Sequence, residues 1–342
     1  MPARAAWPKD TRDSIAFPAK DASFMRNPGT PPLVTIFGGG GFIGRYVCEL
    51  LLKKGVRLRV AERRPRRAWF LQPLGSVGQV STIAADLERP ETIARAVEGA
   101  DAVINLVGTF TGNLDLVHVH GAGKLAAAAR AAGAKAFVHV SSIGADPDSP
   151  SDYGRTKGVG EQAVRSAFPA ATIIRPSVVF GQEDDFTNRF ASMAGLPLLP
   201  VIAPNSRFQP VYVRDLAQAI AEAATAPKAH GGKTYELAGP ETLTMRELNA
   251  EIAGMAGDSP QLVDVPDFIG SAIASLGFLP GAPLTRDQWL MLQKDNVASG
   301  QLPGFKAFGI SPAPIAAVAG EWLGRYRKGG RFAPNREIQS AG

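Results

Sequence analysis

The sequence contains the run Leu33-Val34-Thr35-Ile36-Phe37-Gly38-Gly39-Gly40-Gly41-Phe42-Ile43-Gly44, an apolar, β-branched segment followed by glycines. Gly38, Gly41 and Gly44 have a G-x-x-G-x-x-G spacing, which is typical of a strand that turns into a helix. The first glycine permits a tight turn, the second lets a phosphate approach the backbone, and the third lets the helix pack closely on the strand. Amides at the start of such a helix bind anions. The run therefore predicts a pyrophosphate-binding turn.

Strand-like and helix-like segments alternate after this turn. We expect strands at residues 58–61, 80–84, 102–107, 136–140 and 172–174, and helices at 42–54, 91–97, 123–132, 153–168 and within 211–224. Gly55 gives the first helix a typical C-terminal stop. Alternation with short connections, and strands that are apolar throughout, predict an α/β fold with a Rossmann-type, doubly wound parallel sheet.

The pattern changes after about residue 240, where helical segments separated by Pro and Gly predominate. We expect these helices at residues 244–256, 266–276, 285–294 and 314–326. The predicted organisation is a flexible extension at 1–31, a nucleotide-binding Rossmann domain at 32–240, a smaller and mostly helical lobe at 241–330, and a loose tail at 331–342. Met25 is an alternative start, which would remove residues 1–24.

The composition excludes several classes of protein. The chain of 342 residues is 45% hydrophobic with a formal net charge of +6. No apolar run approaches the roughly 18 residues that span a bilayer, so we expect no transmembrane segment and a cytoplasmic protein. The single cysteine, Cys48, excludes an internal disulfide and is expected to be buried. The basic clusters are not interleaved with aromatic residues, so we do not expect nucleic-acid binding.

The residues that end the second and third strands bear on which dinucleotide binds. Glu62 can accept hydrogen bonds from ribose hydroxyls, which favours NAD(H). Arg63 and Arg64 follow at once, and their guanidinium groups suit a 2′-phosphate. We favour NADP(H) and keep NAD(H) open. Asp86 and Leu87, directly after the third strand, are expected to meet the adenine ring.

Three residues form a candidate catalytic set. Tyr153 and Lys157 have the Y-x-x-x-K spacing of one helix face, and Ser142 ends the fifth strand. We expect the ammonium group to lower the tyrosine pKa toward neutrality, so that the phenol exchanges a proton with a substrate oxygen. Ser142 would hold the same oxygen, and Lys157 would also reach the nicotinamide ribose.

On these motifs the chain resembles the short-chain dehydrogenase/reductase superfamily, in its extended or atypical branch, over residues 33–255. The resemblance rests on the glycine run, Asp86, the 105–108 segment, the Ser–Tyr–Lys set, and the 175–181, 208–217 and 235–239 segments. It implies a set of residues that contact the dinucleotide, in addition to those above: Gly38, Gly40, Gly41, Phe42, Ile43, Gly44, Leu106, Val107, Gly108, Tyr153, Lys157 and Pro176.

Within that superfamily several stretches are most similar to the nucleotide-binding accessory subunit of respiratory complex I. These stretches are residues 60–65, 77–80, 105–110, 180–184, 283–288 and 295–297. The resemblance implies NADPH held mainly for structure, with the protein at the inner face of a membrane and bound to respiratory complex subunits. Glu62 departs from the apolar residue expected there. An active reductase, epimerase or dehydratase is the alternative, and a redox-sensing regulator is a third.

Three further signals carry less weight. His118 and His120 form an H-x-H pair that we expect to lie on the surface, so we predict no metal site. Asp185 is expected to cap the helix that follows it. The apolar segment at 268–279, flanked by Pro266 and Pro280, is either a lid over the cofactor cleft or a surface that meets a membrane or partner.

Overall fold

The computed structural model describes residues 30–277 and 284–327, and its centre is a seven-stranded sheet. The strand order is β11-β6-β5-β4-β1-β2-β3, and every neighbouring pair is parallel. The strands are β1 (Leu33–Phe37), β2 (Arg57–Glu62), β3 (Val80–Ala84), β4 (Ala102–Asn105), β5 (Ala136–Val140), β6 (Thr172–Pro176) and β11 (Thr234–Leu237). The predicted doubly wound α/β fold is confirmed. The order reverses between β1 and β4, where such sheets bind ligands.

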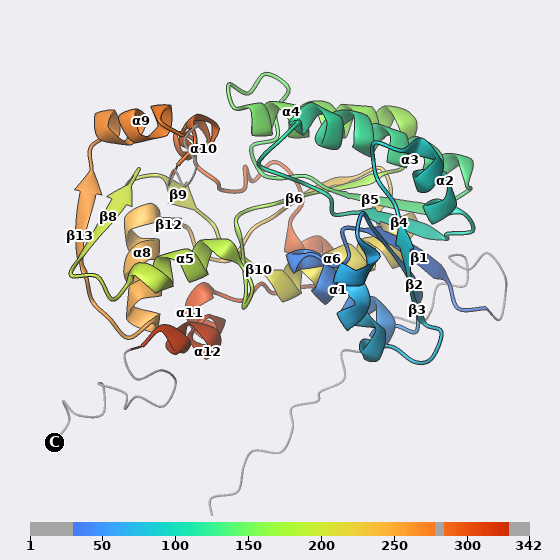
Figure 1. Ribbon diagram of the computed structural model, residues 1–342, viewed down its shortest axis with the longest axis horizontal. Coiled ribbons are helices and arrows are strands. Elements are labelled where there is room, and N and C mark those ends of the chain that lie inside the picture. Colours follow the sequence, from blue (N-terminus) through green and yellow to red (C-terminus); the bar gives the residue numbers. More distant parts are fainter. Residues whose placement is uncertain (1–29, 278–283, 328–342) are drawn as a thin grey trace, which may run out of the picture.

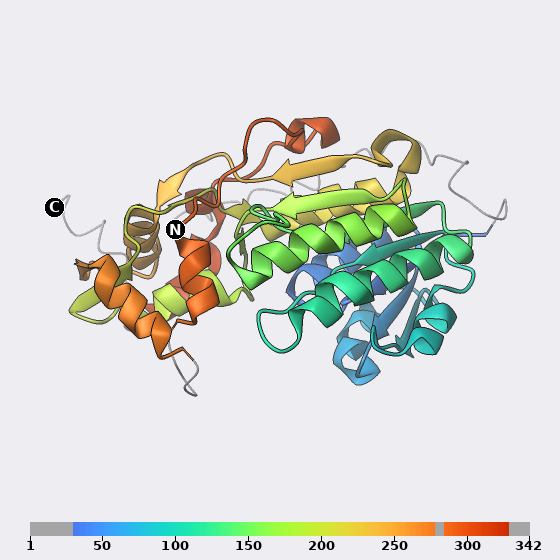
Figure 2. The same ribbon diagram turned by 90° about the horizontal axis from the view of Figure 1, so that it is seen from above.

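Helices cover both faces of this sheet (Figures 1 and 2). One face carries α1 (Phe42–Lys53) and α6 (Val213–Thr225), and the other carries α2 (Pro90–Val97), α3 (Ala122–Ala131) and α4 (Asp152–Ala167). Alternate residues of a strand face opposite sides. In β1, accordingly, Ile36 packs in the apolar cluster on the face covered by α1, and Phe37 packs in the apolar cluster on the face covered by α3. Burial of both faces explains why the central strand β1 is almost wholly apolar, whereas the edge strand β3 is only partly buried and carries Ser81 and Thr82.

Most of the remaining elements form a lobe beside the sheet (Figure 1). Its larger elements are α5 (Asp185–Met193), β8 (Leu198–Ile202), α8 (Met245–Met255), β13 (Gln261–Val265), α9 (Asp267–Ser275) and α10 (Arg286–Leu292). Shorter ones are β7 (Val179–Phe180), β9 (Arg207–Phe208), β10 (Val211–Tyr212), β12 (Leu243–Thr244), α11 (Ile315–Val318) and α12 (Gly320–Leu323). The short α7 (Pro227–His230) belongs to the sheet domain instead, where it contacts α6 and the β6 residue Thr172. The predicted boundary between the Rossmann domain and the lobe at residue 240 stays a prediction. Two elements of this lobe, α5 and β8, come before that residue in the chain.

The structure corrects several sequence-based expectations. The helix expected at 314–326 is broken into α11, α12 and a 3₁₀ turn at Gly324–Tyr326. The fourth strand ends at Asn105, before residue 107. The carboxylate of Asp184 caps α5, so the assignment to Asp185 was wrong. The parallel pair β8–β13 was not expected.

Other expectations are confirmed or fall outside the described residues. Cys48 is buried, and burial raises the pKa of its thiol well above the usual range. No helix in the described part of the chain is both long and apolar enough to cross a membrane. The predicted extension at 1–31 lies outside the described residues except for 30 and 31, and the predicted tail lies wholly outside them.

Candidate functional site

The turn between β1 and α1 has the close approaches that its glycines predict. Gly38 has a φ of +82°. A Cβ on Gly44 would lie only 2.4 Å from the Gly38 carbonyl oxygen. Gly41, the N-cap of α1, offers no side-chain cap, and the first turn of the helix holds no acidic residue. The first amides of α1, those of Phe42 and Ile43 among them, are therefore open to an anion, and this cradle fits a dinucleotide pyrophosphate.

The end of β2 adds both an acceptor and positive charge beside this turn. Glu62 Oε1 accepts a hydrogen bond from the Gly40 amide at 2.8 Å, which holds the carboxylate against the turn. Arg63 and Arg64 are exposed, and neither forms a salt bridge within the described part of the chain. One carboxylate oxygen of Glu62 is thus already hydrogen-bonded within the protein, whereas the guanidinium groups of Arg63 and Arg64 remain available for a 2′-phosphate.

The remaining predicted dinucleotide contacts lie at the same edge of the sheet. A Cβ on Gly38 would lie 3.3 Å from the backbone carbonyl carbon of Leu106, the residue directly after β4. Val107 follows in the same connection, and Pro176 ends β6. After β3, Asp86 Oδ1 accepts the Glu88 amide at 3.1 Å, and Leu87 packs into the core. Contact of Asp86 and Leu87 with an adenine ring stays a prediction.

The candidate catalytic residues meet where β4, β5 and α4 converge. Ser142 follows β5, and Tyr153 and Lys157 lie one turn apart on α4. The buried Lys157 Nζ donates a hydrogen bond to the Val140 carbonyl at 3.1 Å and lies 5.8 Å from the centre of the Tyr153 ring. It is also 3.4 Å from the Cβ position of Gly108. The carboxyl edge of the sheet therefore brings the triad next to the predicted dinucleotide contacts.

The expected lowering of the tyrosine pKa was wrong for this structure. Burial raises the pKa of Tyr153 to about 12, and the neighbouring Ser142 hydroxyl opposes only part of that rise. Burial also lowers the pKa of Lys157 to about 8, because an ammonium group loses its hydration there. Removal from water therefore dominates the pKa of both groups, and the phenol keeps its proton near neutral pH.

His118, expected on the surface, is buried behind the triad. Its Nε2 accepts a hydrogen bond from the Thr109 amide at 3.1 Å, so the proton is on Nδ1, which lies 2.9 Å from Thr156 Oγ1. Burial lowers the pKa of His118 to about 3, so the ring is neutral. Its ring meets the edge of Tyr153 at 5.5 Å. His118 therefore packs against the tyrosine, while His120 is exposed as expected.

An aromatic side chain covers the tyrosine from another side. The Phe110 ring stacks on Tyr153 with ring centres 4.5 Å apart and planes inclined by 14°. Phe110 is itself 60% exposed. It lies in the connection after β4, so this connection both carries predicted dinucleotide contacts and shields one face of the phenol.

The N-terminus of the catalytic helix has acceptors from α4's own N-cap and from the lobe. The Ser151 hydroxyl, at the N-cap, accepts the Gly154 amide at 3.2 Å. The Asp287 carboxylate, from α10, accepts the Asp152 amide at 2.6 Å and the Tyr153 amide at 3.1 Å. A carboxylate at a helix N-terminus satisfies unpaired amides and complements the helix dipole. The position of Tyr153 therefore depends on α10.

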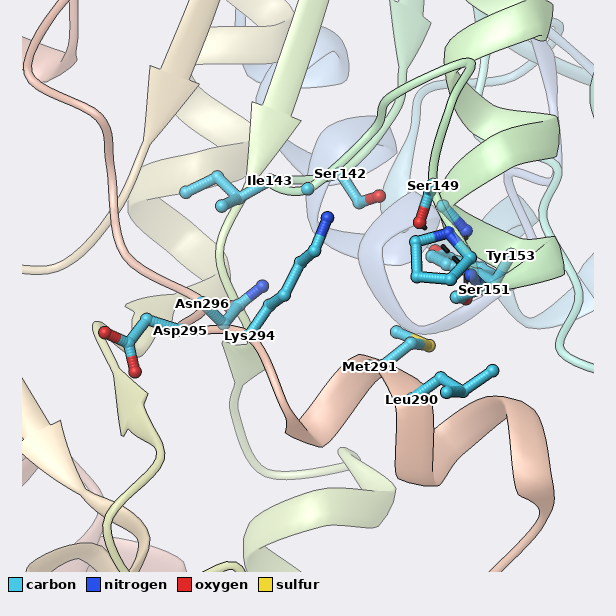
Figure 3. Close-up of a pocket in the computed structure, with 13 residues that line it drawn as sticks. Ser142, Ile143, Ser149, Ser151, Tyr153, Leu290, Met291, Lys294, Asp295 and Asn296 are labelled. Atoms are coloured by element: carbon cyan, nitrogen blue, oxygen red, sulfur yellow. Dashed lines mark hydrogen bonds between the residues drawn. The ribbon is translucent and has the colours of Figure 1, made fainter.

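A pocket opens between the Ser142 and Tyr153 side chains and the lobe (Figure 3). Its lining includes Ser142 and Tyr153 on one side and residues of α10 and the segment after it on the other, namely Leu290, Met291, Lys294 and Asn296. Asn296 Oδ1 accepts hydrogen bonds from Ser177 Oγ and from the Val178 amide, both at 2.7 Å. These bonds fix the wall of the pocket to the connection after β6.

Reasoning from sequence missed several of these residues. His118 and Phe110 gave no signal of burial or stacking, because their partners are remote in sequence. Asp287 and Asn296 did lie in segments that carried the resemblance to the complex I subunit, but a sequence cannot show that they contact α4 and β6.

Comparison with known proteins agrees with this geometry. The model of the NAD dependent epimerase/dehydratase family matches residues 34–238. The chain belongs to that family. It is 35% identical to the mouse mitochondrial NADH dehydrogenase [ubiquinone] 1 alpha subcomplex subunit 9, over 86% of this chain and 80% of that protein. It is 33% identical to a ceramide reductase of Caulobacter vibrioides, over 69% and 74% of the two chains.

A solved structure supports the fold alone. An NADPH-dependent quinone oxidoreductase from Escherichia coli, complexed with NADPH, has a TM-score of 0.67 and 22% identity. The match covers 85% of this chain and 99% of that one.

Proposed function

We propose that this protein is an accessory or assembly subunit of respiratory complex I that holds NADP(H) mainly as a structural group. The observation that carries the proposal is the 35% identity to the mouse complex I subunit, which extends over 86% of the chain and past the sheet into the lobe. A ligand that binds only the folded state stabilises it by mass action, even without turnover.

The residues available at the nucleotide site support this assignment. The Gly38–Gly44 turn and the first amides of α1 would bind the pyrophosphate, and Arg63 and Arg64 would bind the 2′-phosphate of NADP(H). Glu62 already accepts the Gly40 amide, so its acceptor capacity for an unmodified ribose is reduced. NAD(H) remains the competing ligand, because the second oxygen of Glu62 can still accept a ribose hydroxyl.

The surroundings of Tyr153 support a structural rather than a catalytic nucleotide. Burial raises the pKa of the phenol to about 12, and Phe110 covers one face of its ring. A general acid or base works best when its pKa lies near the working pH. Burial therefore moves the Tyr153 pKa further from neutral pH, which makes proton transfer by the phenol less favourable.

An exposed apolar face of the lobe supports assembly with a partner. Phe268 on α9 is 73% exposed, and Leu276 directly after it is 55% exposed. Of the two interpretations of the 268–279 segment, this exposure favours a contact surface over a lid, for its described part. Peripheral attachment at the inner face of a membrane follows if the partner is a membrane-bound respiratory complex.

The test is nucleotide analysis of gently purified protein together with fractionation of its native cells. We expect NADPH to co-purify, to stay reduced when carbonyl compounds are added, and the protein to sediment with membrane-bound complex I. A protein found only in the soluble fraction, with a nucleotide site that exchanges freely, would refute the proposal.

Active reduction is the second candidate, and the convergence of Ser142, Tyr153 and Lys157 favours it. The nicotinamide supplies or accepts a hydride when it is bound. Ser142 would orient the substrate oxygen, Tyr153 would give it a proton from its hydroxyl, and Lys157 would hold the ribose. Epimerase or dehydratase activity would use the same residues.

Tyr153→Phe separates the two candidates. If the protein is an enzyme, this variant loses NADPH oxidation by at least about a hundredfold and keeps its nucleotide. If the protein is an accessory subunit, the variant retains both the nucleotide and assembly.

A further inference from the structure

The pocket beside Ser142 and Tyr153 carries an unbalanced positive charge. Lys294 follows α10 and lines the pocket, and its side chain points across it toward Ser142 (Figure 3). Lys294 has no salt-bridge partner in residues 30–277 or 284–327. Its ammonium group is therefore available to a ligand.

The acid among the lining residues does not neutralise this lysine. Asp295 Oδ1 accepts the Arg207 amide at 2.9 Å, and Oδ2 lies 2.8 Å from Arg207 Nε and 2.6 Å from Nη2. This pair satisfies the Asp295 carboxylate outside the pocket. In Figure 3 its side chain points away from Lys294.

The other groups of the pocket are hydrogen-bond donors and apolar side chains. Ser142 and Tyr153 offer hydroxyl groups, and the Asn296 amide nitrogen is left over because its oxygen binds Ser177 and Val178. Leu290 and Met291 form an apolar wall. A ligand that fits has an apolar body, an oxygen for the hydroxyl groups, and an anionic group for Lys294.

We propose that this pocket binds a small carbonyl compound with an anionic group, a carboxylate or a phosphate ester, and that Lys294 selects for that charge. The oxygen of the carbonyl group meets Ser142 and Tyr153, the apolar body lies against α10, and the anion meets Lys294. The assignment concerns binding alone, so it holds whether the protein turns the compound over or only retains it.

The test compares two ligands that differ in one charge, 4-carboxybenzaldehyde and its neutral methyl ester, methyl 4-formylbenzoate. Binding to the full-length protein is measured by isothermal titration calorimetry, for the wild type, Lys294→Gln and Lys306→Gln. Lys306 is the matched control, because it is an exposed lysine that does not line the pocket.

We expect the wild type and Lys306→Gln to bind the carboxylate about tenfold more tightly than the ester, and Lys294→Gln to bind both equally. Added salt should weaken the preference. Equal binding of the two compounds by the wild type, a preference that persists in Lys294→Gln, or binding of neither compound would overturn the proposal. None of these results depends on complex I or on NADPH oxidation, so the accessory-subunit proposal stands or falls separately.

Discussion

Replacing Gly44 by alanine places a methyl group in the tightest contact of the nucleotide-binding turn. The new Cβ would lie 2.4 Å from the Gly38 carbonyl oxygen and 2.6 Å from both Cα and the carbonyl oxygen of Gly39. All three atoms are backbone, so no side chain can rotate away, and α1 must move off β1. Overpacking of this kind costs about 1–3 kcal/mol. We therefore expect Gly44→Ala to lower the free energy of unfolding by at least about 1 kcal/mol and to weaken nucleotide binding.

Gly254→Ala is the matched control for this prediction. Gly254 lies in α8, is exposed, and has no heavy atom within 4 Å of its Cβ position. There the same substitution should stabilise the protein by about 1 kcal/mol, because alanine has the higher helix propensity. Urea unfolding of both variants, with and without NADP⁺, measures the difference. Equal stability of Gly44→Ala and the wild type would refute the close packing of α1 on β1.

Three further perturbations test the site. Replacing both Arg63 and Arg64 by glutamine should weaken NADP⁺ binding about tenfold and leave NAD⁺ binding unchanged; calorimetry showing an equal loss for both would contradict the assignment. Burial holds the pKa of His118 at about 3, below its usual 6.5, so the unfolded chain takes up the proton first. The free energy of unfolding should therefore fall as the pH drops from 6.5 toward 3, and urea titrations of His118→Gln should show a shallower fall. Asp287→Ala should cost about 1 kcal/mol, since two amides of α4 lose their acceptor; an unchanged melting temperature would mean that these amides find another one.

The sheet could be predicted because its determinants are local. The central strands β1 and β4 are short, mostly apolar runs. A glycine such as Gly38 or Gly55 ends an element at a φ that other residues rarely adopt. The spacing of Tyr153 and Lys157 likewise fixes their common helix face, whatever the rest of the chain does. For such features neighbouring residues contain enough information.

The electrostatics of the site could not be predicted, because they depend on contacts between distant segments. The Tyr153 pKa was expected to fall with Lys157 nearby, but burial dominates, and burial depends on how α4 packs on the sheet. His118 looks like a surface residue until Thr109 and Thr156 surround it. The pairing of β8 with β13 was similarly hidden, since about sixty residues separate the two strands.

The hydrogen bonds of Asn296 affect the entropic cost of ligand binding in the pocket. Its side-chain oxygen holds the connection after β6, and its backbone carbonyl accepts the Gln209 amide at 3.1 Å. The wall that carries Lys294 is therefore ordered before a ligand arrives, and binding does not have to freeze a loop. A change in affinity on altering a side chain of this wall would report the lost contact itself, free of any entropy of loop ordering.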